Sequence, residues 1–267
     1  MLTNLHTHTS FCDGKNTPEE IVLRAISDGF SSIGFSGHGF TEFDISYCMK
    51  DTDGYISEIN RLKEKYKEKI QIYLGIEEDA FAPVCRKAFD YVIGSSHYVL
   101  KDGEYYAVDS GAEYMQKCIE VFDGNVIALA DSYYKGFCDY ISNHKPDIIG
   151  HFDLITKFDE QTGMRFLENK QYLALSEKYV SRAAKENIIF EVNTGAISRG
   201  MRTTPYPYEN LLYTLKKLGA GITLSSDSHS VDTLSFGFSE AERMLKDIGF
   251  TYVYKYYDGG FVKSWLI

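Results

Sequence analysis

The sequence is short of the features that mark secreted, membrane-bound and nucleic-acid-binding proteins. No apolar run reaches the about 18 residues that a membrane-spanning helix needs, and the N-terminal MLTNLHTHTS lacks the cationic start and apolar stretch of a secretory signal. The five dispersed cysteines form no C-x-x-C pair, which predicts reduced thiols and a cytoplasmic protein. Lys and Arg total 28 against 38 Asp and Glu, a net charge of -10, so the basic face that nucleic acids require is not expected.

The order of apolar and amphipathic segments predicts an α/β fold. Seven short runs are apolar or β-branched, like strands buried on both faces: Leu2–Thr7, Ser32–Ser36, Gln71–Ile76, Tyr91–Gly94, Asp147–Gly150, Ile188–Val192 and Gly221–Ser225. Amphipathic segments separate them and are expected to be helices: Asp53–Lys69, Gly111–Phe122, Val126–Ser142, Lys170–Glu186, Tyr208–Leu218 and Ser239–Asp247. Because no proline-rich or low-complexity linker interrupts the alternation, we expect one domain over residues 1–267. Seven strands favour a closed or nearly closed barrel, with an open doubly wound sheet as the alternative.

Two local signals mark the ends of further elements. Thr17-Pro18-Glu19-Glu20 combines a helix cap, a proline at the first helical position and the glutamate of a capping box, so a helix begins there. Near the C-terminus, Asp258-Gly259-Gly260 lies between two apolar runs of Tyr252–Trp265. This pattern predicts a closing hairpin, and the alternative is a C-terminal extension without defined structure.

The histidines are placed in a way that predicts a common site. Six of the seven stand at or just after the end of an expected strand: His6, His8, His38, His97, His151 and His229. Two carboxylates, Glu77 and Asp227, are placed in the same way. In a barrel of parallel strands, side chains at the carboxyl ends converge on one mouth, and residues two apart on a strand face the same side. The seventh, His144, lies in a polar stretch and is expected in solvent.

Grouped imidazoles favour metal binding. They repel one another when protonated and leave lone pairs unused when neutral, unless a divalent cation joins them. Imidazole with carboxylate suits zinc, iron or manganese. Six histidines are more than one four-coordinate ion uses, so we expect two or three ions. Clustered ions favour attack on a phosphate ester, because they hold a hydroxide and neutralise the phosphate oxygens.

Seven motifs in order resemble one known family. HTHTSFCDG, GHGF, GIEED, GSSH, GHFD, EVNTGAISRG and SSDSH are similar to the motifs of the polymerase and histidinol phosphatase (PHP) family, and most of all to its monofunctional histidinol-phosphatase branch. The resemblance extends from His6 to His229, nearly the whole chain. It implies a distorted (β/α)7 TIM-like barrel with a three-metal centre at the carboxyl-terminal mouth of the strands.

The resemblance also implies a ligand for each ion. It assigns His6, His8, Glu77 and Asp227 to the first ion, Glu77 with His97 and His151 to the second, and His38 and His229 to the third. Many relatives supply the last ligand of the third ion with a histidine shortly after the HxH pair. Here the segment reads Ser10-Phe11-Cys12-Asp13-Gly14, so Asp13 is the candidate. The alternative for Asp13 is a turn residue before glycine.

The implied reaction is hydrolysis of L-histidinol phosphate to L-histidinol and phosphate. A metal-bridging hydroxide is the expected nucleophile, with Glu77 and Asp227 as catalytic ligands. The EVNTGAISRG motif presents Arg199 to the substrate phosphate, and guanidinium suits bidentate phosphate contacts. Arg202 is a second candidate and Arg165 a third.

Two roles and the exact function stay open at the level of sequence. A metal-bound water, Asp153 or Asp227 can serve as the leaving-group acid. Glu78, Asp79 or Asp153 can contact the amine of the substrate, or can be solvated surface charges. The competing functions are a PHP phosphoesterase for another small phosphorylated metabolite or a nucleotide, an amidohydrolase-type C–N hydrolase, and a non-catalytic metal-binding module.

Overall fold

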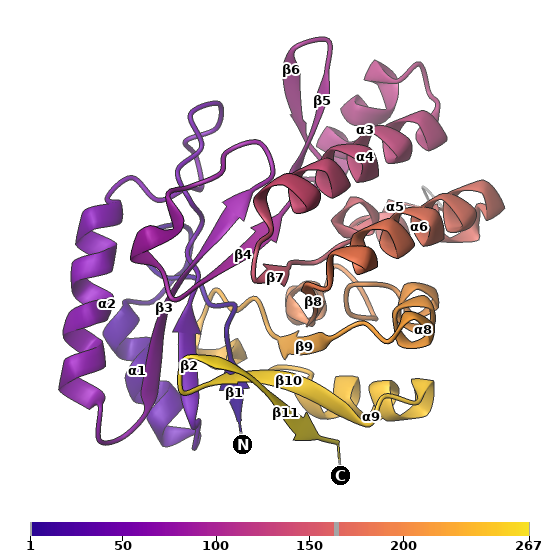
Figure 1. Cartoon of the computed structure of the whole chain (residues 1–267). Coiled ribbons are helices and arrows are strands. Elements are labelled where there is room, and N and C mark those ends of the chain that lie inside the picture. The colour runs from indigo at the N-terminus through magenta and orange to yellow at the C-terminus, as the bar shows by residue number, and fades with distance from the viewer. Residues whose placement is uncertain (1, 163–165, 267) are drawn as a thin grey trace.

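The strands of the protein form one curved, mostly parallel sheet (Figure 1). The computed structural model describes residues 2–162 and 166–266. Within that part of the chain the sheet order is β1-β2-β3-β4-β7-β8-β9-β10-β11. The strands are β1 (Thr3–Asn4), β2 (Ser32–Phe35), β3 (Gln71–Asp79), β4 (Tyr91–Ser95), β7 (Ile148–Ile149), β8 (Ile189–Asn193), β9 (Ile222–Ser225), β10 (Tyr252–Tyr257) and β11 (Gly260–Trp265). All seven predicted strands are therefore confirmed, and all are parallel to their neighbours.

The sheet curls until its first and seventh parallel strands meet at the carboxyl end. Thr7 and Ser228 form a single parallel bridge, in which the His8 N–H donates to Ser228 O at 2.8 Å and the Ser228 N–H donates to His6 O at 3.0 Å. No longer ladder joins β1 to β9 within the described residues. The result is the TIM-like α/β arrangement predicted from the sequence, closed at its mouth by one residue pair.

The C-terminal hairpin occupies the opposite end of the barrel. β10 pairs with β9 only through Tyr254 and Thr223 and pairs with β11 along its whole length, which confirms the predicted hairpin. It lies across the base of the sheet in Figure 1, where the Tyr256 ring is 4.8 Å from the ring of Tyr73. The hairpin therefore packs against the base of the barrel through Tyr256.

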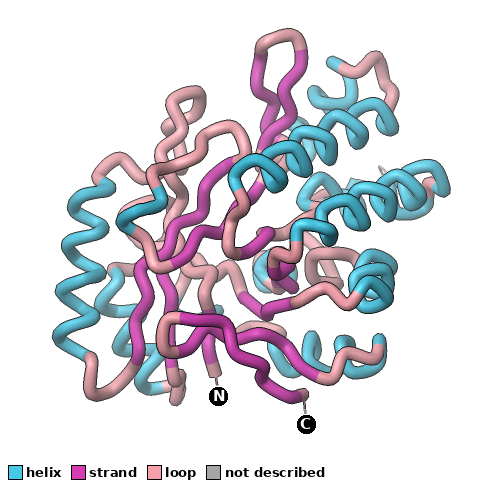
Figure 2. The backbone as a smooth tube through the Cα atoms, in the orientation of Figure 1, coloured by secondary structure: helices cyan, strands magenta, loops and turns pink. Residues whose placement is uncertain are grey.

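Helices cover the outer face of the sheet (Figure 2). They are α1 (Pro18–Ser27), α2 (Thr52–Tyr66), α3 (Ala112–Val121), α4 (Val126–His144), α5 (Asp159–Thr162), α6 (Lys170–Ala183), α7 (Gly195–Ser198), α8 (Glu209–Leu218) and α9 (Phe238–Ile248). The predicted capping box is present at α1, where Thr17 and Glu20 cap each other's backbone N–H groups. No helix in the described part of the chain is long and apolar enough to cross a membrane.

An aromatic floor fills the inside of the barrel beneath the mouth. Tyr91 of β4 is 1% exposed, and its hydroxyl donates to the carbonyl oxygens of Leu5 and Phe35 on the facing strands. Gly75 of β3 leaves the room for this ring, because a Cβ there would lie 2.2 Å from a ring carbon of Tyr91. The interior beneath the mouth is therefore a packed core, as in other barrels of this kind.

One hairpin was missed by the sequence analysis. β5 (Tyr98–Lys101) and β6 (Glu104–Ala107) pair antiparallel and project beyond the mouth in Figure 1. Asp102 and Gly103 form the turn with φ of 53° and 87°. Asp-Gly between apolar runs is a strong hairpin signal because both turn residues need positive φ, so the information was present in the sequence.

Candidate metal centre

The six predicted histidines meet at the mouth of the barrel. The rings of neighbouring members lie 4.1 to 5.2 Å apart, centroid to centroid, along the series His229, His8, His38, His97 and His151, and His6 lies 5.1 Å from His8. Each follows the carboxyl end of a parallel strand, as does Asp227 after β9, while Glu77 lies in the last three residues of β3. His144 is exposed at the end of α4, as predicted. Convergence of parallel strand ends accounts for this grouping.

Glu77 is the centre of the cluster. Its side chain is fully buried, and its Oε2 lies 3.2 Å from His6 Nε2 and 2.9 Å from His38 Nδ1. Its Oε1 lies 3.0 Å from His151 Nε2 and 3.5 Å from His97 Nε2. Burial alone would raise the pKa of this carboxyl, but the surrounding imidazoles hold it well below its usual value. An ionised carboxylate with imidazoles on both oxygens has the geometry of a bridging metal ligand.

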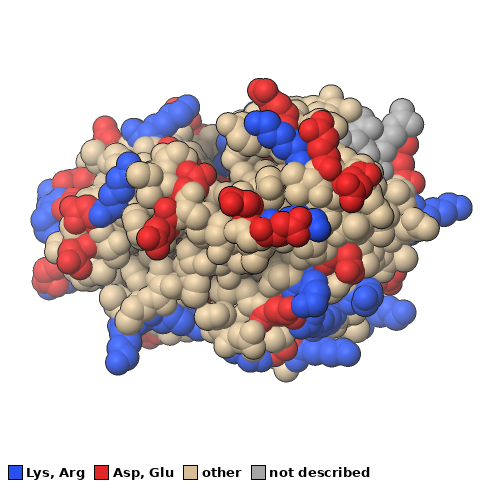
Figure 3. Space-filling model, turned by 90° about the horizontal axis from the view of Figure 1, so that it is seen from above, with Lys and Arg blue, Asp and Glu red and all other residues tan. Residues whose placement is uncertain are grey.

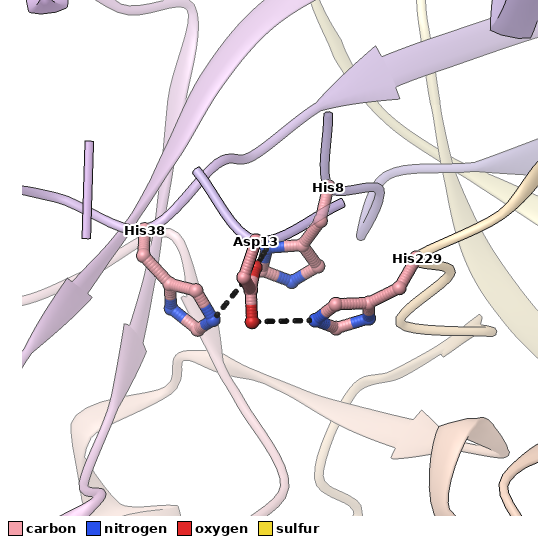
Figure 4. A group of neighbouring side chains, drawn as sticks. All are labelled: His8, Asp13, His38 and His229. Atoms are coloured by element: carbon pink, nitrogen blue, oxygen red, sulfur yellow. Dashed lines mark ion pairs between the residues drawn. The ribbon is translucent and has the colours of Figure 1, made fainter. Parts of the chain in front are cut away.

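Asp13 turns its carboxylate between three imidazoles (Figure 4). Its Oδ2 lies 3.2 Å from His229 Nε2, and its Oδ1 lies 3.6 Å from His8 Nδ1 and 3.7 Å from His38 Nε2. The side chain is 34% exposed, yet it faces the cluster. This orientation favours the ligand interpretation of Asp13 over the turn interpretation.

The ligand atoms form four overlapping groups, each compact enough for one cation. The groups are His8, Asp13, His38 and His229; His6, Glu77 and His151; His6, His8 and Asp227; and His38, Glu77 and His97. All nine predicted ligands are included. Three histidines have neighbours beyond those that the family resemblance implies, since His8 also faces Asp13, His38 also faces Glu77, and His6 groups with His151. The division of ligands among the ions remains a prediction.

Buried polar atoms in the cluster lack hydrogen-bond partners. His6 Nε2, His8 Nε2 and Glu77 Oε2 are each inaccessible to solvent and form no hydrogen bond of normal geometry, although charged neighbours lie as close as 2.9 Å. Leaving such a group unpaired costs about 1–3 kcal/mol. Divalent cations would satisfy all three atoms, and nitrogen and carboxylate donors suit zinc, iron or manganese. The residues therefore fit two or more metal ions.

Burial and neighbouring charges shift the pKa values of the clustered imidazoles in opposite directions. Burial by itself lowers the pKa of His97, but Glu77 and the hydrogen bond to Asp79 raise it to about 9. The pKa of His6 is also raised, against burial, by Glu191 and Glu77. Burial and the charge of neighbouring imidazoles lower the pKa of His8 to about 3. Because metal ligation needs neutral imidazole, cations must displace protons from His6 and His97.

The two candidate arginines have different surroundings. Arg199 donates to Asp227 Oδ2 at 2.9 Å and to Asp227 O at 3.0 Å, and its side chain is 32% exposed on the cavity wall. Arg202 is 4% exposed and donates to Thr156 Oγ1 at 2.7 Å, with its guanidinium 4.1 Å from the Tyr206 ring. Arg202 is absent from the residues that line the cavity, and its contact with the substrate phosphate stays a prediction. Arg165 lies outside the described residues.

The cluster forms one side of a cavity of about 290 Å³. The other walls carry Arg199, Asp44, Tyr98, Asp109 and Lys157. On the face seen from above, acidic and basic side chains are interspersed, with no continuous basic expanse (Figure 3). A cavity of this size suits a small metabolite.

Comparison with known proteins identifies the family. A family model described as the PHP domain matches residues 4–195, a span that contains every predicted ligand except Asp227 and His229. The chain belongs to the PHP domain family.

Relatives of this PHP domain include proteins named as phosphatases. A probable histidinol-phosphatase of Schizosaccharomyces pombe is 28% identical over 92% of this chain and 86% of that protein. The histidinol-phosphatase of Lactococcus lactis subsp. lactis is 29% identical over 92% of this chain and 90% of that protein.

Two solved structures share the fold. That of a putative histidinol phosphatase from Listeria monocytogenes has a TM-score of 0.77 and 23% identity, covering 90% of this chain and 99% of that one. That of the Lactococcus lactis histidinol phosphate phosphatase, solved with zinc, L-histidinol and phosphate, has a TM-score of 0.73 and 24% identity, covering 98% of each chain. Both likenesses establish the α/β fold of this PHP domain.

The acidic residues predicted to contact a substrate amine do not line the cavity. Glu78 accepts from the Tyr140 hydroxyl and from Val84 N–H. Asp79 accepts from His97 Nδ1 at 3.1 Å, so it orients a candidate ligand. Asp153 is fully buried, accepts from Tyr208 N–H at 2.9 Å and lies 4.0 Å from Arg202. The alternate direction of side chains along β3 turns Glu78 away from the site that Glu77 faces.

Glu191, which was not among the residues predicted for the site, positions two histidines of this PHP domain. Glu191 of β8 is 1% exposed and accepts from His6 Nδ1 at 2.6 Å and from the His151 backbone N–H at 2.9 Å. It further accepts from Asn193 Nδ2 at 2.9 Å and from the Ser225 hydroxyl. A carboxylate partner on the second ring nitrogen orients a metal-binding imidazole and raises its basicity. The available signal was a glutamate inside a strand predicted to be buried on both faces.

Proposed function

We propose that this chain is a metal-dependent phosphomonoesterase that hydrolyses L-histidinol phosphate to L-histidinol and phosphate. The observation that carries the proposal is the cluster of imidazoles and carboxylates on one wall of a small cavity with Arg199 on another. Relatives named as histidinol-phosphatases match 92% of the chain. The Lactococcus lactis protein of that name was solved with zinc, L-histidinol and phosphate, which supports the choice of substrate.

The nine clustered side chains are proposed as the metal ligands: His6, His8, Asp13, His38, Glu77, His97, His151, Asp227 and His229. When bound, divalent ions supply a nucleophile from water at neutral pH and neutralise charge on the phosphate oxygens. Glu77 would serve more than one ion, because both of its oxygens face imidazoles.

Arg199 is proposed to bind the substrate phosphate. Its guanidinium is held against Asp227 by two hydrogen bonds, so its orientation is set before substrate arrives. With a third of the side chain exposed to the cavity, N–H groups remain for phosphate oxygens. The paired geometry of guanidinium and phosphate then fixes the ester relative to the metal ligands.

The size and charge of the site favour a small metabolite over a nucleic acid. The cavity of about 290 Å³ holds one small molecule, and the net charge of -10 opposes a polyanion. We also propose that the protein works in the cytoplasm, which its five free cysteines support.

Phosphate release from the metal-loaded protein tests the function. L-histidinol phosphate should be cleaved faster than sugar phosphates or nucleotides. His151→Ala should abolish turnover, because it removes a ligand that lies 3.0 Å from Glu77, whereas the matched control His144→Ala changes an exposed histidine and should leave the rate unchanged. Activity on other phosphomonoesters with none on L-histidinol phosphate would overturn the substrate assignment. An active His151→Ala enzyme would overturn the site.

Replacing Arg199 tests the phosphate contact. Arg199→Ala should raise KM at least tenfold, since it removes charge-assisted hydrogen bonds worth about 1.5–3 kcal/mol. Its metal content, measured by elemental analysis, should stay that of the wild type. An unchanged KM would place the phosphate contact elsewhere.

A further inference from the structure

The Asp44 carboxylate on the cavity wall is held only by neutral groups. It lies between β2 and α2, where its Oδ1 accepts from the Ser46 N–H at 3.0 Å and the Ser46 hydroxyl at 2.6 Å. Its Oδ2 accepts from the Tyr98 hydroxyl at 2.7 Å. Burial alone would raise the pKa of Asp44, but these hydrogen bonds lower it, so the group is ionised at neutral pH. A carboxylate has about four acceptor positions, and three are used here.

The other acidic side chains of the cavity have positive or potentially positive partners. Asp109 lies 3.1 Å from the Lys157 ammonium, and Asp227 lies 2.9 Å from the Arg199 guanidinium. Glu77 and Asp13 face the imidazoles of the cluster. Within residues 2–162 and 166–266, no basic side chain forms an ion pair with Asp44. An oriented anion without a cation is therefore available to a ligand.

Asp44 and Arg199 line the same cavity and have different neighbours there. Arg199 Nη1 lies 3.3 Å from His229 Nδ1, while Asp44 is hydrogen-bonded to Tyr98, the residue that follows His97. The imidazoles lie in the order His229, His8, His38 and His97, with centroid separations of 4.1, 4.3 and 5.2 Å. The cavity wall thus carries a guanidinium beside His229 and an uncompensated carboxylate beside the Tyr98 hydroxyl.

An aromatic groove adjoins the metal cavity at Asp44. It has a volume of about 430 Å³ and shares Asp44, Ser46, Tyr98 and Ser110 with the metal cavity. Phe43 packs in it, 4.9 Å from Tyr98 and 4.0 Å from Tyr105, centroid to centroid. A leaving group that extends past Asp44 therefore meets aromatic walls.

We infer that Asp44 binds an ammonium group of the leaving alcohol and so makes the enzyme select phosphate esters of amino alcohols. The inference rests on the proposed phosphatase function and adds the residue that selects among its substrates. With phosphate at Arg199, a substrate that places an ammonium group at Asp44 matches the charges of the cavity wall. An ester whose alcohol has no amine leaves the Asp44 carboxylate without a cationic partner in the enzyme–substrate complex, and this uncompensated charge lowers the affinity.

Asp44→Asn is the direct test, because the amide keeps the shape of the side chain and removes its charge. The two substrates are L-histidinol phosphate and its deamino analogue, 3-(imidazol-4-yl)propyl phosphate, which differ only in the amine. We expect kcat/KM for L-histidinol phosphate to fall roughly 10- to 100-fold, the range for a hydrogen bond to a charged group. For the analogue, kcat/KM should change less than twofold. Glu42→Gln, which removes an exposed charge from the same segment, is the matched control and should leave both values unchanged.

A measurement on the wild-type enzyme covers the case in which Asp44→Asn does not fold. L-histidinol should inhibit the release of phosphate at a concentration at least tenfold below that of 3-(imidazol-4-yl)propanol. Equal inhibition by the two alcohols, or an equal loss of both activities in a folded Asp44→Asn enzyme, would overturn the role of Asp44. A wild-type enzyme that cleaves neither ester would overturn the proposed function, and with it this inference, before any variant is compared.

Discussion

Glu191→Gln should weaken metal binding without removing any proposed ligand. The Glu191 carboxylate accepts four hydrogen bonds, two on each oxygen, including those from His6 Nδ1 and the His151 N–H. A glutamine side chain keeps one acceptor oxygen and turns an NH2 group toward donors on the other side. Whichever way the amide is oriented, its NH2 group faces either the His6 Nδ1–H or the His151 N–H, and that contact becomes donor against donor.

The expected magnitude follows from what Glu191 orients. Glu191 fixes the ring of His6 and the backbone N–H of His151, and the side chains of both histidines face Glu77. Replacing a partner of this kind lowers metal affinity about 10- to 100-fold, which corresponds to about 1.4–2.7 kcal/mol. Competition between the protein and a fluorescent zinc chelator measures this difference directly.

Glu78→Gln is the matched control for Glu191→Gln. Glu78 is also 1% exposed, but its partners are the Tyr140 hydroxyl and the Val84 N–H, which are not proposed ligands. The Glu78→Gln variant should have a lower free energy of unfolding and the same zinc affinity as the wild type. If Glu191→Gln is folded and binds zinc as tightly as the wild type, or if both variants lose affinity equally, the argument from ring orientation is refuted.

Three further predictions concern protons, packing and backbone space. Zinc binding to the metal-free protein at pH 7 should release protons, and zinc affinity should rise with pH up to about 9, because the pKa of His97 is raised to about 9 and ligation needs the neutral ring. Calorimetry in buffers of different ionisation enthalpy measures this release. A heat of binding that did not depend on the buffer would contradict the prediction. Arg202→Leu should lower the free energy of unfolding by about 3 kcal/mol or more, since it leaves Asp153 buried without a cation. The KM for substrate should not change. A raised KM would indicate that Arg202 contacts the substrate phosphate. Gly14→Ala should lower the metal content measured by elemental analysis, because the added Cβ would lie 2.5 Å from backbone atoms of His8. A metal content equal to that of the wild type would show that the loop of Gly14 can move without displacing His8.

Local patterns in the sequence were sufficient for the strands and for the members of the metal cluster. Short β-branched runs such as Ser32–Ser36 can be recognised because burial on both faces of a parallel sheet leaves few polar positions. The histidines could be grouped before any coordinates, because parallel strands in a barrel present all their carboxyl ends at one mouth. His6 and His229 are far apart in sequence, yet the position of each after a strand was enough to predict that they meet.

The sequence alone did not distinguish residues whose roles depend on distant partners. Arg199 and Arg202 stand three positions apart in the sequence, and only the fold turns one toward Asp227 and the other against the Tyr206 ring. Glu78 and Asp44 carry the same charge, but one is buried against Tyr140 and the other faces the cavity.

Sequence by itself therefore determined the α/β barrel type and which residues gather at its mouth, because both follow from periodicities of a few residues repeated along the chain. Only the tertiary structure decided which partner each charged side chain has: Glu191 positions His6, and Asp44 lacks a cationic partner. The physical reason is that desolvation and charge compensation act between groups that are close in space, and those neighbours come from strands and loops that the local pattern does not connect.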